Sequence, residues 1–227
     1  MSIKKHIPNT ITCCNLISGC IATYYAFCDQ YQYALLFIII GAVFDFFDGM
    51  SARLLNVSSP IGKELDSLAD DITFGFAPSA MIFSYLCTFH IHIIVIPFLA
   101  FVMAAFSALR LAKFNLDERQ TLGFIGLPTP ANALFWGSLI AGAGSWLATI
   151  PYIGYILLVG VFLSCYLLIA EIPMFALKFK HWGWKDNEIK YIFILSCIPL
   201  LLLLGVSGFA AIIAWYIILS LDRKSVV

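Results

Sequence analysis

Long runs of apolar residues, separated by short polar stretches, cover most of the chain. The runs extend over about 10–28, 33–55, 66–88, 93–114, 131–150, 151–170, 188–204 and 205–221. Each run is close to the roughly 20 residues with which an α-helix crosses the hydrocarbon core of a bilayer. The pattern therefore predicts an all-α fold, a polytopic membrane helical bundle of about eight transmembrane helices.

The composition supports a lipid bilayer as the surroundings of this chain. Hydrophobic residues make up 62% of it and charged residues 11%, and its mean hydropathy is +0.95. Such values exclude a water-soluble globule with a polar surface. The formal net charge is zero, so charge gives no reason to expect a nucleic-acid partner. The seven cysteines are scattered without C-x-x-C spacing, which favours packing residues over metal ligands or disulfides.

The positive charges predict how the bundle is oriented. With a cytoplasmic N-terminus and eight spans, all 13 Lys and Arg residues fall in cytoplasmic segments. The outer turns, near Asp29, His90, Ser145 and Gly205, contain none, as the positive-inside bias requires. We therefore expect a multi-pass protein of the cell inner (cytoplasmic) membrane with both termini in the cytoplasm.

Acidic and small residues recur at fixed spacing in the second apolar run and the head of the third. They form the pattern D-x2-D-G-x2-A-R-x8-G-x3-D-x3-D: Asp45, Asp48, Gly49, Ala52, Arg53, Gly62, Asp66 and Asp70. On an α-helix the first two acids are about 60° apart and the last two about 40° apart, so each pair shares a face. Four carboxylates inside a membrane would cost about 10 to 14 kcal/mol at about 2.5 to 3.5 each. A cost of that size points to bound cations.

Carboxylate oxygens suit hard divalent cations, and two facing pairs can hold the two metals of a phosphoryl-transfer site. Gly49 and Ala52 keep this face free of bulk, and Arg53 supplies a forked cation for a phosphate. One alternative is a polar cluster in which the acids pair with Arg53, Lys63, Arg110 and Lys113. Another is a cation transporter, which is disfavoured because the acids gather toward one membrane face and 115–227 holds no second copy.

The pattern from Asp45 to Asp70 matches the signature of the CDP-alcohol phosphatidyltransferases position for position, and the chain resembles that family. The resemblance implies a six-helix catalytic core, here 1–175, followed by a cytoplasmic loop and two additional transmembrane helices in 176–227. It also implies Mg²⁺ or Mn²⁺, with two ions expected. Carried over, Asp45, Asp48 and Asp66 are metal ligands, and Asp70 is both close to the metals and the general base. The implied CDP-binding residues are Gly49, Ala52, Arg53 and Gly62, with Asn9 and Thr12 of the segment PNTIT at 8–12.

Further segments narrow the acceptor alcohol. The run ELDSLADDITFGFAPSAM from 64, ALRLAKFN at 108–115 and GFIGLPTPANA at 123–133 are similar to the bacterial CDP-diacylglycerol–serine O-phosphatidyltransferase branch. This resemblance implies CDP-diacylglycerol and L-serine as substrates. Thr73 stands where many relatives are expected to have serine. Glycerol 3-phosphate or an inositol phosphate is the alternative acceptor, although a phosphorylated acceptor should require a larger cluster of cations.

A zwitterionic serine needs a cation for its carboxylate inside a low-dielectric site. Arg110 and Lys113, one helical turn apart, are candidates for that cation, with Asn115 and Asn132 as further polar contacts. The alternative is that the two cations only anchor the helix at the cytoplasmic surface. The small residues of 142–144 can pack either a homodimer or the bundle itself.

Overall fold

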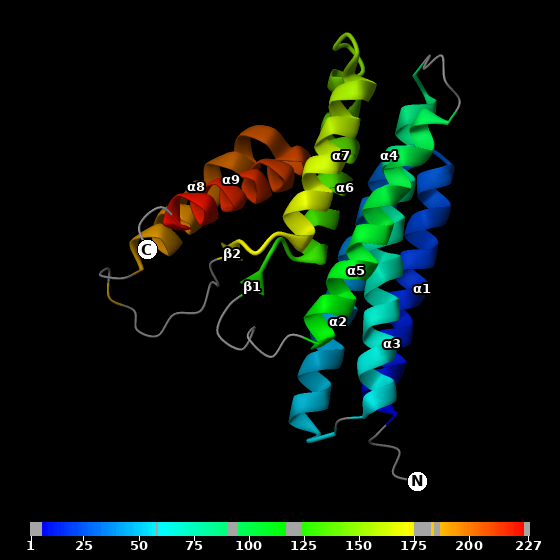
Figure 1. Cartoon of the computed structure of the whole chain (residues 1–227), viewed down its shortest axis with the longest axis vertical. Helices are drawn as coiled ribbons and strands as arrows, with labels where there is room; N and C mark the ends of the chain where they lie inside the picture. Colours follow the sequence, from blue (N-terminus) through cyan, green and yellow to red (C-terminus); the bar gives the residue numbers. More distant parts are fainter. Residues whose placement is uncertain are drawn as a thin grey trace.

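The computed structural model describes residues 6–57, 59–89, 95–116, 124–174, 183 and 187–224 (Figure 1). Within these ranges the chain forms eight helical segments, one for each predicted apolar run. In chain order the elements are α1 (Ile7–Phe27), α2 (Tyr31–Leu54), α3 (Pro60–Asp70), η2 (Asp71–Phe76), α4 (Ala77–Cys87), η3 (Ile96–Phe101), α5 (Val102–Leu116), β1 (Phe124–Ile125), α6 (Thr129–Leu147), α7 (Ile153–Ile169), β2 (Pro173–Met174), α8 (Glu188–Leu204), η5 (Gly205–Ser207) and α9 (Gly208–Lys224). The elements α3, η2 and α4 follow one another without a break, as do η3 and α5.

Four of the described helical stretches are long and apolar enough to cross a membrane. They are Ile7–Phe27, Tyr31–Leu54, Ile96–Leu116 and Glu188–Leu221. The last stretch contains the turn at Gly205, whose φ is +56°, between α8 and α9. The prediction of an all-α, polytopic membrane bundle is therefore confirmed.

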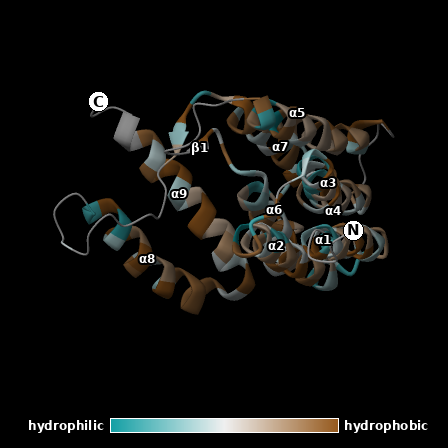
Figure 2. Cartoon of the chain, turned by 90° about the horizontal axis from the view of Figure 1, so that it is seen from below, coloured by the Kyte–Doolittle hydropathy of each residue, from teal (hydrophilic) through white to brown (hydrophobic). Residues whose placement is uncertain are grey.

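The elements α1 to α7 run roughly upright in Figure 1, and the α8–α9 hairpin leans away to one side. Figure 2 shows the same arrangement from below, with hydrophobic residues along α8 and hydrophilic ones near α3 and α5. The main core of the bundle includes Ile38, Phe74, Met81 and Trp136, all with at most 2% of their surface exposed. Apolar groups therefore fill the space between the upright helices.

The α8–α9 hairpin is attached to the bundle through α9 and the turn η5. Tyr216 and its neighbours Ile213 and Ile217 pack against buried residues such as Leu127 and Leu167. A short antiparallel pairing of β1 with β2, which the apolar pattern does not predict, lies beside this contact. That 176–227 is a unit separate from a 1–175 core stays a prediction, and 175–182 and 184–186 of its loop lie outside the described residues.

The stretch of small residues at 142–144 packs within the chain. A Cβ atom at Gly142 would meet the backbone of Ser207, and one at Gly144 would lie 3.5 Å from the ring of Tyr85. These two glycines therefore serve contacts of α6 with η5 and α4. A homodimer stays a prediction that these contacts do not require.

The helix that carries Asp66 and Asp70 changes its winding directly after Asp70. Residues Asp71–Phe76 form a π-helical turn, and such turns are rare and frequently lie at functional sites. Thr73 of this turn is fully buried, and its Oγ1 donates a hydrogen bond of 3.0 Å to the backbone oxygen of Asn15. A Cβ atom at Gly41 would lie 2.5 Å from Cγ2 of Thr73, so α2 also packs closely against the turn. The wide turn is thus held between α1 and α2, immediately beside the acidic residues.

Candidate active site

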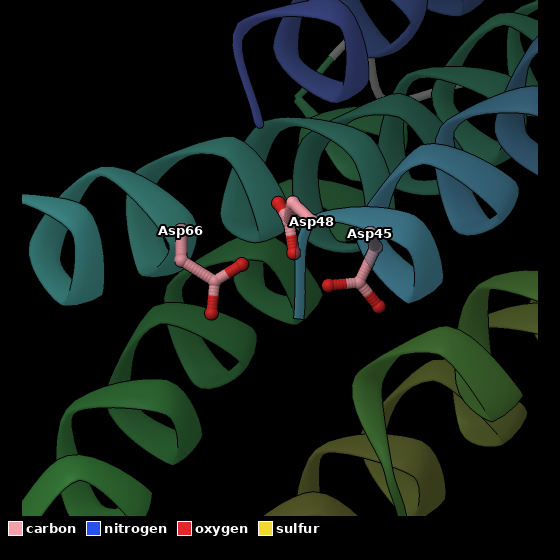
Figure 3. A group of neighbouring side chains, drawn as sticks. All are labelled: Asp45, Asp48 and Asp66. Carbon is pink, nitrogen blue, oxygen red and sulfur yellow. The ribbon is translucent and has the colours of Figure 1, made fainter. Parts of the chain in front are cut away.

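Three carboxyl groups from two helices converge in the structure. Asp45 and Asp48 come from the C-terminal half of α2 and Asp66 from α3, and the ligand oxygens of the three lie within 4.8 Å of one another (Figure 3). The start of α3 is well defined, because the Ser59 side chain caps it by accepting a 2.9 Å hydrogen bond from the Gly62 N–H. The local sequence thus fixes where α3 begins, and the third carboxylate faces the other two.

The surroundings of the three carboxylates fit a divalent cation. Asp48 is 6% exposed and accepts a 2.6 Å hydrogen bond from Thr12, while Oδ1 of Asp66 is buried and has no hydrogen-bond partner. Within the described residues, none of the motif acids forms an ion pair with Lys or Arg. The alternative of a purely internal salt-bridge cluster is therefore wrong for this part of the chain. Buried carboxylates without a cationic partner are costly, and hard metal ions are what such oxygens bind.

Asp70 lies beside this group but has a different partner. Its Oδ1 accepts a 3.0 Å hydrogen bond from Nδ2 of Asn15, and its carboxylate is within electrostatic range of the three other acids. Asn15 is fully buried, and its backbone oxygen is the acceptor for Thr73. Asp70 is therefore oriented by α1, next to the candidate metal site and outside the group of three.

A cavity of about 290 Å³ opens beside Asp48 and Asp66. It is lined by Pro8, Asn9, Thr12, Asp48, Gly49, Ala52, Val57, Ser59, Gly62, Lys63 and Asp66. A Cβ atom at Gly49 would have nothing within 4 Å, and one at Gly62 would lie 3.0 Å from Oδ1 of Asn9. The structure thus brings five of the six residues predicted to bind CDP to one cavity. The sixth, Arg53, is exposed and is not among the lining residues, whereas Lys63 is.

The residues predicted to contact serine divide into two groups. Arg110 is 7% exposed, its Nε has no hydrogen-bond partner, and its guanidinium lies 5.8 Å from the ring centroid of Phe114. It is within electrostatic range of Asp70. Asn132 is fully buried; its Nδ2 contacts the sulfur of Met103 at 3.2 Å, and its Oδ1 has no partner. These two side chains retain polar atoms that a ligand can satisfy.

The other two residues of that set have different surroundings. Lys113 is exposed. Asn115 connects α5 to α3, because its Nδ2 donates to Oγ of Ser67 at 2.7 Å and its backbone oxygen accepts a 2.8 Å hydrogen bond from Lys63. Arg110 and Lys113 are only three positions apart, yet Arg110 is buried within electrostatic range of Asp70 and Lys113 lies at the surface.

Sequence reasoning missed several polar side chains around Asp70. Asn15 orients Asp70, and the buried atoms Oδ1 of Asp71 and Oγ of Ser107 have no hydrogen-bond partner. A Cβ atom at Gly75 would lie 2.6 Å from that Asp71 oxygen and 3.4 Å from the Ser107 hydroxyl, so the two groups are neighbours. The signal in the sequence was a polar residue inside an apolar run, which is costly in a membrane helix and so marks a partner or a ligand.

Comparisons with known proteins agree with this geometry. The sequence profile of the CDP-alcohol phosphatidyltransferase family matches residues 5–157. The chain belongs to this family. Over 182 residues it is 35% identical to the CDP-diacylglycerol–serine O-phosphatidyltransferase of Bacillus subtilis (strain 168), an alignment that covers 78% of this chain and 92% of the relative.

Two further relatives carry the same name. The Helicobacter pylori (strain ATCC 700392 / 26695) protein is 36% identical over 129 residues, which are 56% of this chain and 54% of the relative. The Saccharomyces cerevisiae (strain ATCC 204508 / S288c) protein is 41% identical over 108 residues, or 44% of this chain and 38% of the relative. The predicted resemblance to the serine-using branch is confirmed by these similarities, and the matched family segment ends within α7.

Proposed function

We propose that this chain transfers a phosphatidyl group from CDP-diacylglycerol to the hydroxyl of L-serine, giving phosphatidylserine and CMP. One observation carries the proposal: the three carboxylates of Asp45, Asp48 and Asp66 meet beside a cavity lined by small residues, in a member of the CDP-alcohol phosphatidyltransferase family. The names of its relatives support serine as the acceptor.

The metal would be held by Asp45, Asp48 and Asp66, with Asp70 close by. Their convergence, together with the unpaired buried oxygen of Asp66, fits Mg²⁺ or Mn²⁺, and two ions are expected. When bound, the ions would neutralise the pyrophosphate of the CDP-linked lipid and the charge that develops on the leaving phosphate. Thr12 keeps Asp48 in place through its 2.6 Å hydrogen bond.

Asp70 is suited to accept the proton of the attacking hydroxyl. Asn15 occupies its Oδ1, which leaves Oδ2 for the substrate. As the serine oxygen forms a bond to the phosphorus of the phosphatidyl group, its proton passes to Asp70 and the bond from that phosphorus to CMP breaks. The side-chain amide of Asn15 would fix the direction of the carboxylate throughout.

Arg110 would bind the carboxylate of serine. It is buried, has an unpaired Nε and lies within electrostatic range of the proposed base, so an acceptor held by it would be near Asp70. The Oδ1 of buried Asn132 would accept from the serine ammonium or a bound water. A phosphorylated acceptor would require more positive charge than one guanidinium group provides. Among the described residues, Arg110 is the one buried Lys or Arg side chain.

The decisive experiment supplies CDP-diacylglycerol with labelled serine, glycerol 3-phosphate and inositol phosphate in turn. Label should enter lipid from serine and CMP should be released in equal amount. Incorporation from glycerol 3-phosphate or inositol phosphate, with none from serine, would contradict the proposed acceptor while leaving the family assignment intact.

The reaction is proposed to face the cytoplasm, because the carboxylates lie toward the end of α2 that the charge distribution places inside. Cysteines introduced at the exposed positions Asn56 and Gln30 test this orientation, after the seven native cysteines are replaced. A membrane-impermeant reagent should label position 30 in intact cells and position 56 only in broken cells. Labelling of position 56 from outside would reverse the proposed orientation.

A further inference from the structure

A second cavity, of about 420 Å³, lies at the opposite end of the bundle from the carboxylates. Its lining comes from the turn between α1 and α2 and from α2, α4 and α6: Asp29, Gln30, Tyr31, Gln32, Tyr33, Tyr85, Ile140, Ala141, Gly144, Ser145 and Ala148. Along α2, Tyr31 precedes Asp45 by 14 positions, which is about 21 Å at 1.5 Å per residue. The cavity is therefore distinct from the proposed active site.

A fixed negative charge lies at this cavity. Asp29 is exposed, and its Oδ1 accepts hydrogen bonds from the Tyr31 hydroxyl at 2.8 Å and the Ser84 hydroxyl at 2.6 Å. Neither bond uses Oδ2. The lining contains no Lys or Arg, the sequence has none between residues 6 and 52, and within the described residues Asp29 forms no ion pair. A positioned carboxylate thus lacks a protein cation.

Aromatic rings accompany the carboxylate. Tyr31 and Tyr85 meet edge to face with ring centroids 5.9 Å apart, and Tyr33 lies on the same lining. Tyr85 is 5% exposed, and its hydroxyl donates to the Gly144 backbone oxygen at 2.6 Å, so this ring is held rigidly. Ring faces beside a carboxylate attract ammonium groups, both primary and quaternary. The combination of a carboxylate and aromatic rings is therefore compatible with an organic ammonium group.

Exposed aromatic residues lie close in sequence to the lining of this cavity. Tyr24 and Trp146 are each 65% exposed, Tyr33 is 55% exposed and Phe27 is 49% exposed. Tyr33 is itself a lining residue, and the other three lie within about five positions of one. Tyr and Trp are enriched where lipid headgroups meet the hydrocarbon, which fits a cavity at headgroup depth.

We propose that this cavity binds the ammonium group of a zwitterionic phospholipid, of the phosphatidylethanolamine or phosphatidylcholine type, from the leaflet opposite the active site. The Asp29 carboxylate would face the ammonium, and the tyrosine rings would cover its sides. The same carboxylate repels phosphatidylglycerol and phosphatidic acid, which carry no positive charge. The site is independent of the transfer reaction, because none of its lining residues touches the carboxylate cluster.

Native mass spectrometry of the full chain, purified in detergent, tests the proposal. Dioleoyl phosphatidylethanolamine and phosphatidylglycerol are titrated separately, and the bound fraction gives an apparent Kd for each. The zwitterionic lipid should bind about tenfold more tightly, and Asp29→Asn should remove that preference, because the amide keeps the shape and the hydrogen-bond acceptor but loses the charge. Glu64→Gln, an exposed acid of α3 at the other end, is the matched control and should leave the preference unchanged.

Two further measurements complete the test. A second variant guards against misfolding of Asp29→Asn, and competition with a soluble amine identifies the source of the ammonium group. Tyr33→Leu, at an exposed ring, should weaken binding of phosphatidylethanolamine about threefold while the phosphatidylglycerol Kd stays constant. Equal retention of the two lipids by the parent chain, or an unchanged preference in Asp29→Asn, would overturn the site. Free ethanolamine that displaces the lipid at the concentration where dihexanoyl phosphatidylethanolamine does so would overturn the lipid assignment in favour of a soluble amine.

Discussion

Two glycines of α2, Gly41 and Gly49, lie about two helical turns apart in opposite surroundings. A Cβ atom at Gly41 would lie 2.5 Å from Cγ2 of Thr73 and 2.9 Å from Oδ1 of Asn15. A Cβ atom at Gly49 would have nothing within 4 Å. The first glycine permits helices to approach, and the second leaves a space between them.

The difference shows how one helix serves two purposes. Around Gly41, the close approach of α1, α2 and the π-helical turn fixes the backbones that carry Asn15 and Thr73. Around Gly49, the same helices stay apart, and the carboxylates of α2 and α3 line the opening between them. Changes in the open region should therefore alter activity, and changes in the packed region should alter stability.

Removing divalent cations should have the largest effect on activity, because the carboxylates of the open region are proposed to bind them. Excess chelator should reduce transfer to the detection limit, because the carboxylates alone leave four like charges close together. Adding Mg²⁺ or Mn²⁺ beyond the chelator should restore the rate. Label transfer from serine measures this, and full activity of stripped enzyme in chelator would contradict the metal site.

Asp70→Asn should lower kcat by about 10²- to 10⁴-fold, the usual contribution of a positioned general base. The thermal unfolding midpoint should change little, since the amide can still meet Asn15 after a rotation. Asp45→Asn is the comparison variant: raising the Mn²⁺ concentration should recover part of its rate and none of the rate of Asp70→Asn. Equal recovery of both variants would show that Asp70 acts as a metal ligand and not as the base.

Arg110→Gln should raise the KM for serine by about 10- to 150-fold, because a charge-assisted hydrogen bond contributes about 1.5 to 3 kcal/mol. The KM for CDP-diacylglycerol should stay within about twofold. Lys113→Gln is the matched control on the exposed side of α5 and should leave both values unchanged. A parallel rise in both KM values for Arg110→Gln would indicate a phosphate contact instead.

The packed region should respond in stability. Gly41→Ala forces a methyl group against Thr73 and Asn15 and should lower the free energy of unfolding by about 1 to 3 kcal/mol. Gly49→Ala adds the same methyl group to open space, and its stability should be unchanged or slightly higher, since Ala favours the helix. Thermal unfolding in one detergent compares the two. An equal loss of unfolding free energy in both variants would show that the packed and the open region do not differ in their contribution to stability.

The apolar pattern was sufficient to predict the helical segments, because they are encoded locally. The spacing of the acidic residues likewise pointed to the three carboxylates that converge in the structure. All eight predicted runs contain a described helix, and α8 has the predicted bounds of 188–204. The third segment begins at Pro60, six residues before the predicted 66. Its first turns contain Lys63 and Glu64, which hydropathy counts against a membrane helix, although Ser59 and Pro60 form an N-cap and first-turn signal.

The features that the sequence did not predict depend on contacts between distant segments. Asn15 and Asp70 are 55 positions apart, and nothing in either local pattern pairs them. The pairing of β1 with β2 joins residues 124–125 to 173–174 and likewise needs the folded bundle. Arg110 and Lys113 have similar sequence surroundings, and only the packing around α5 buries one and exposes the other.

The π-helical turn at Asp71–Phe76 has a consequence for insertions and deletions in this chain. It winds one residue more per hydrogen-bonded turn than an α-helix, so a single deletion inside it would let α3 and α4 merge into one regular helix. The residues beyond the deletion would keep their orientation, because the wide turn accommodates one extra residue. If all the residues instead wound as a regular α-helix, the part beyond the turn would rotate by about 100°, which turns the buried face with Ala77, Ala80 and Met81 away from the bundle. The wide turn thus sets the rotational phase between the part of the helix that carries the acids and the part that packs. Homologous helices without it should therefore be one residue shorter between their acids and their packing face.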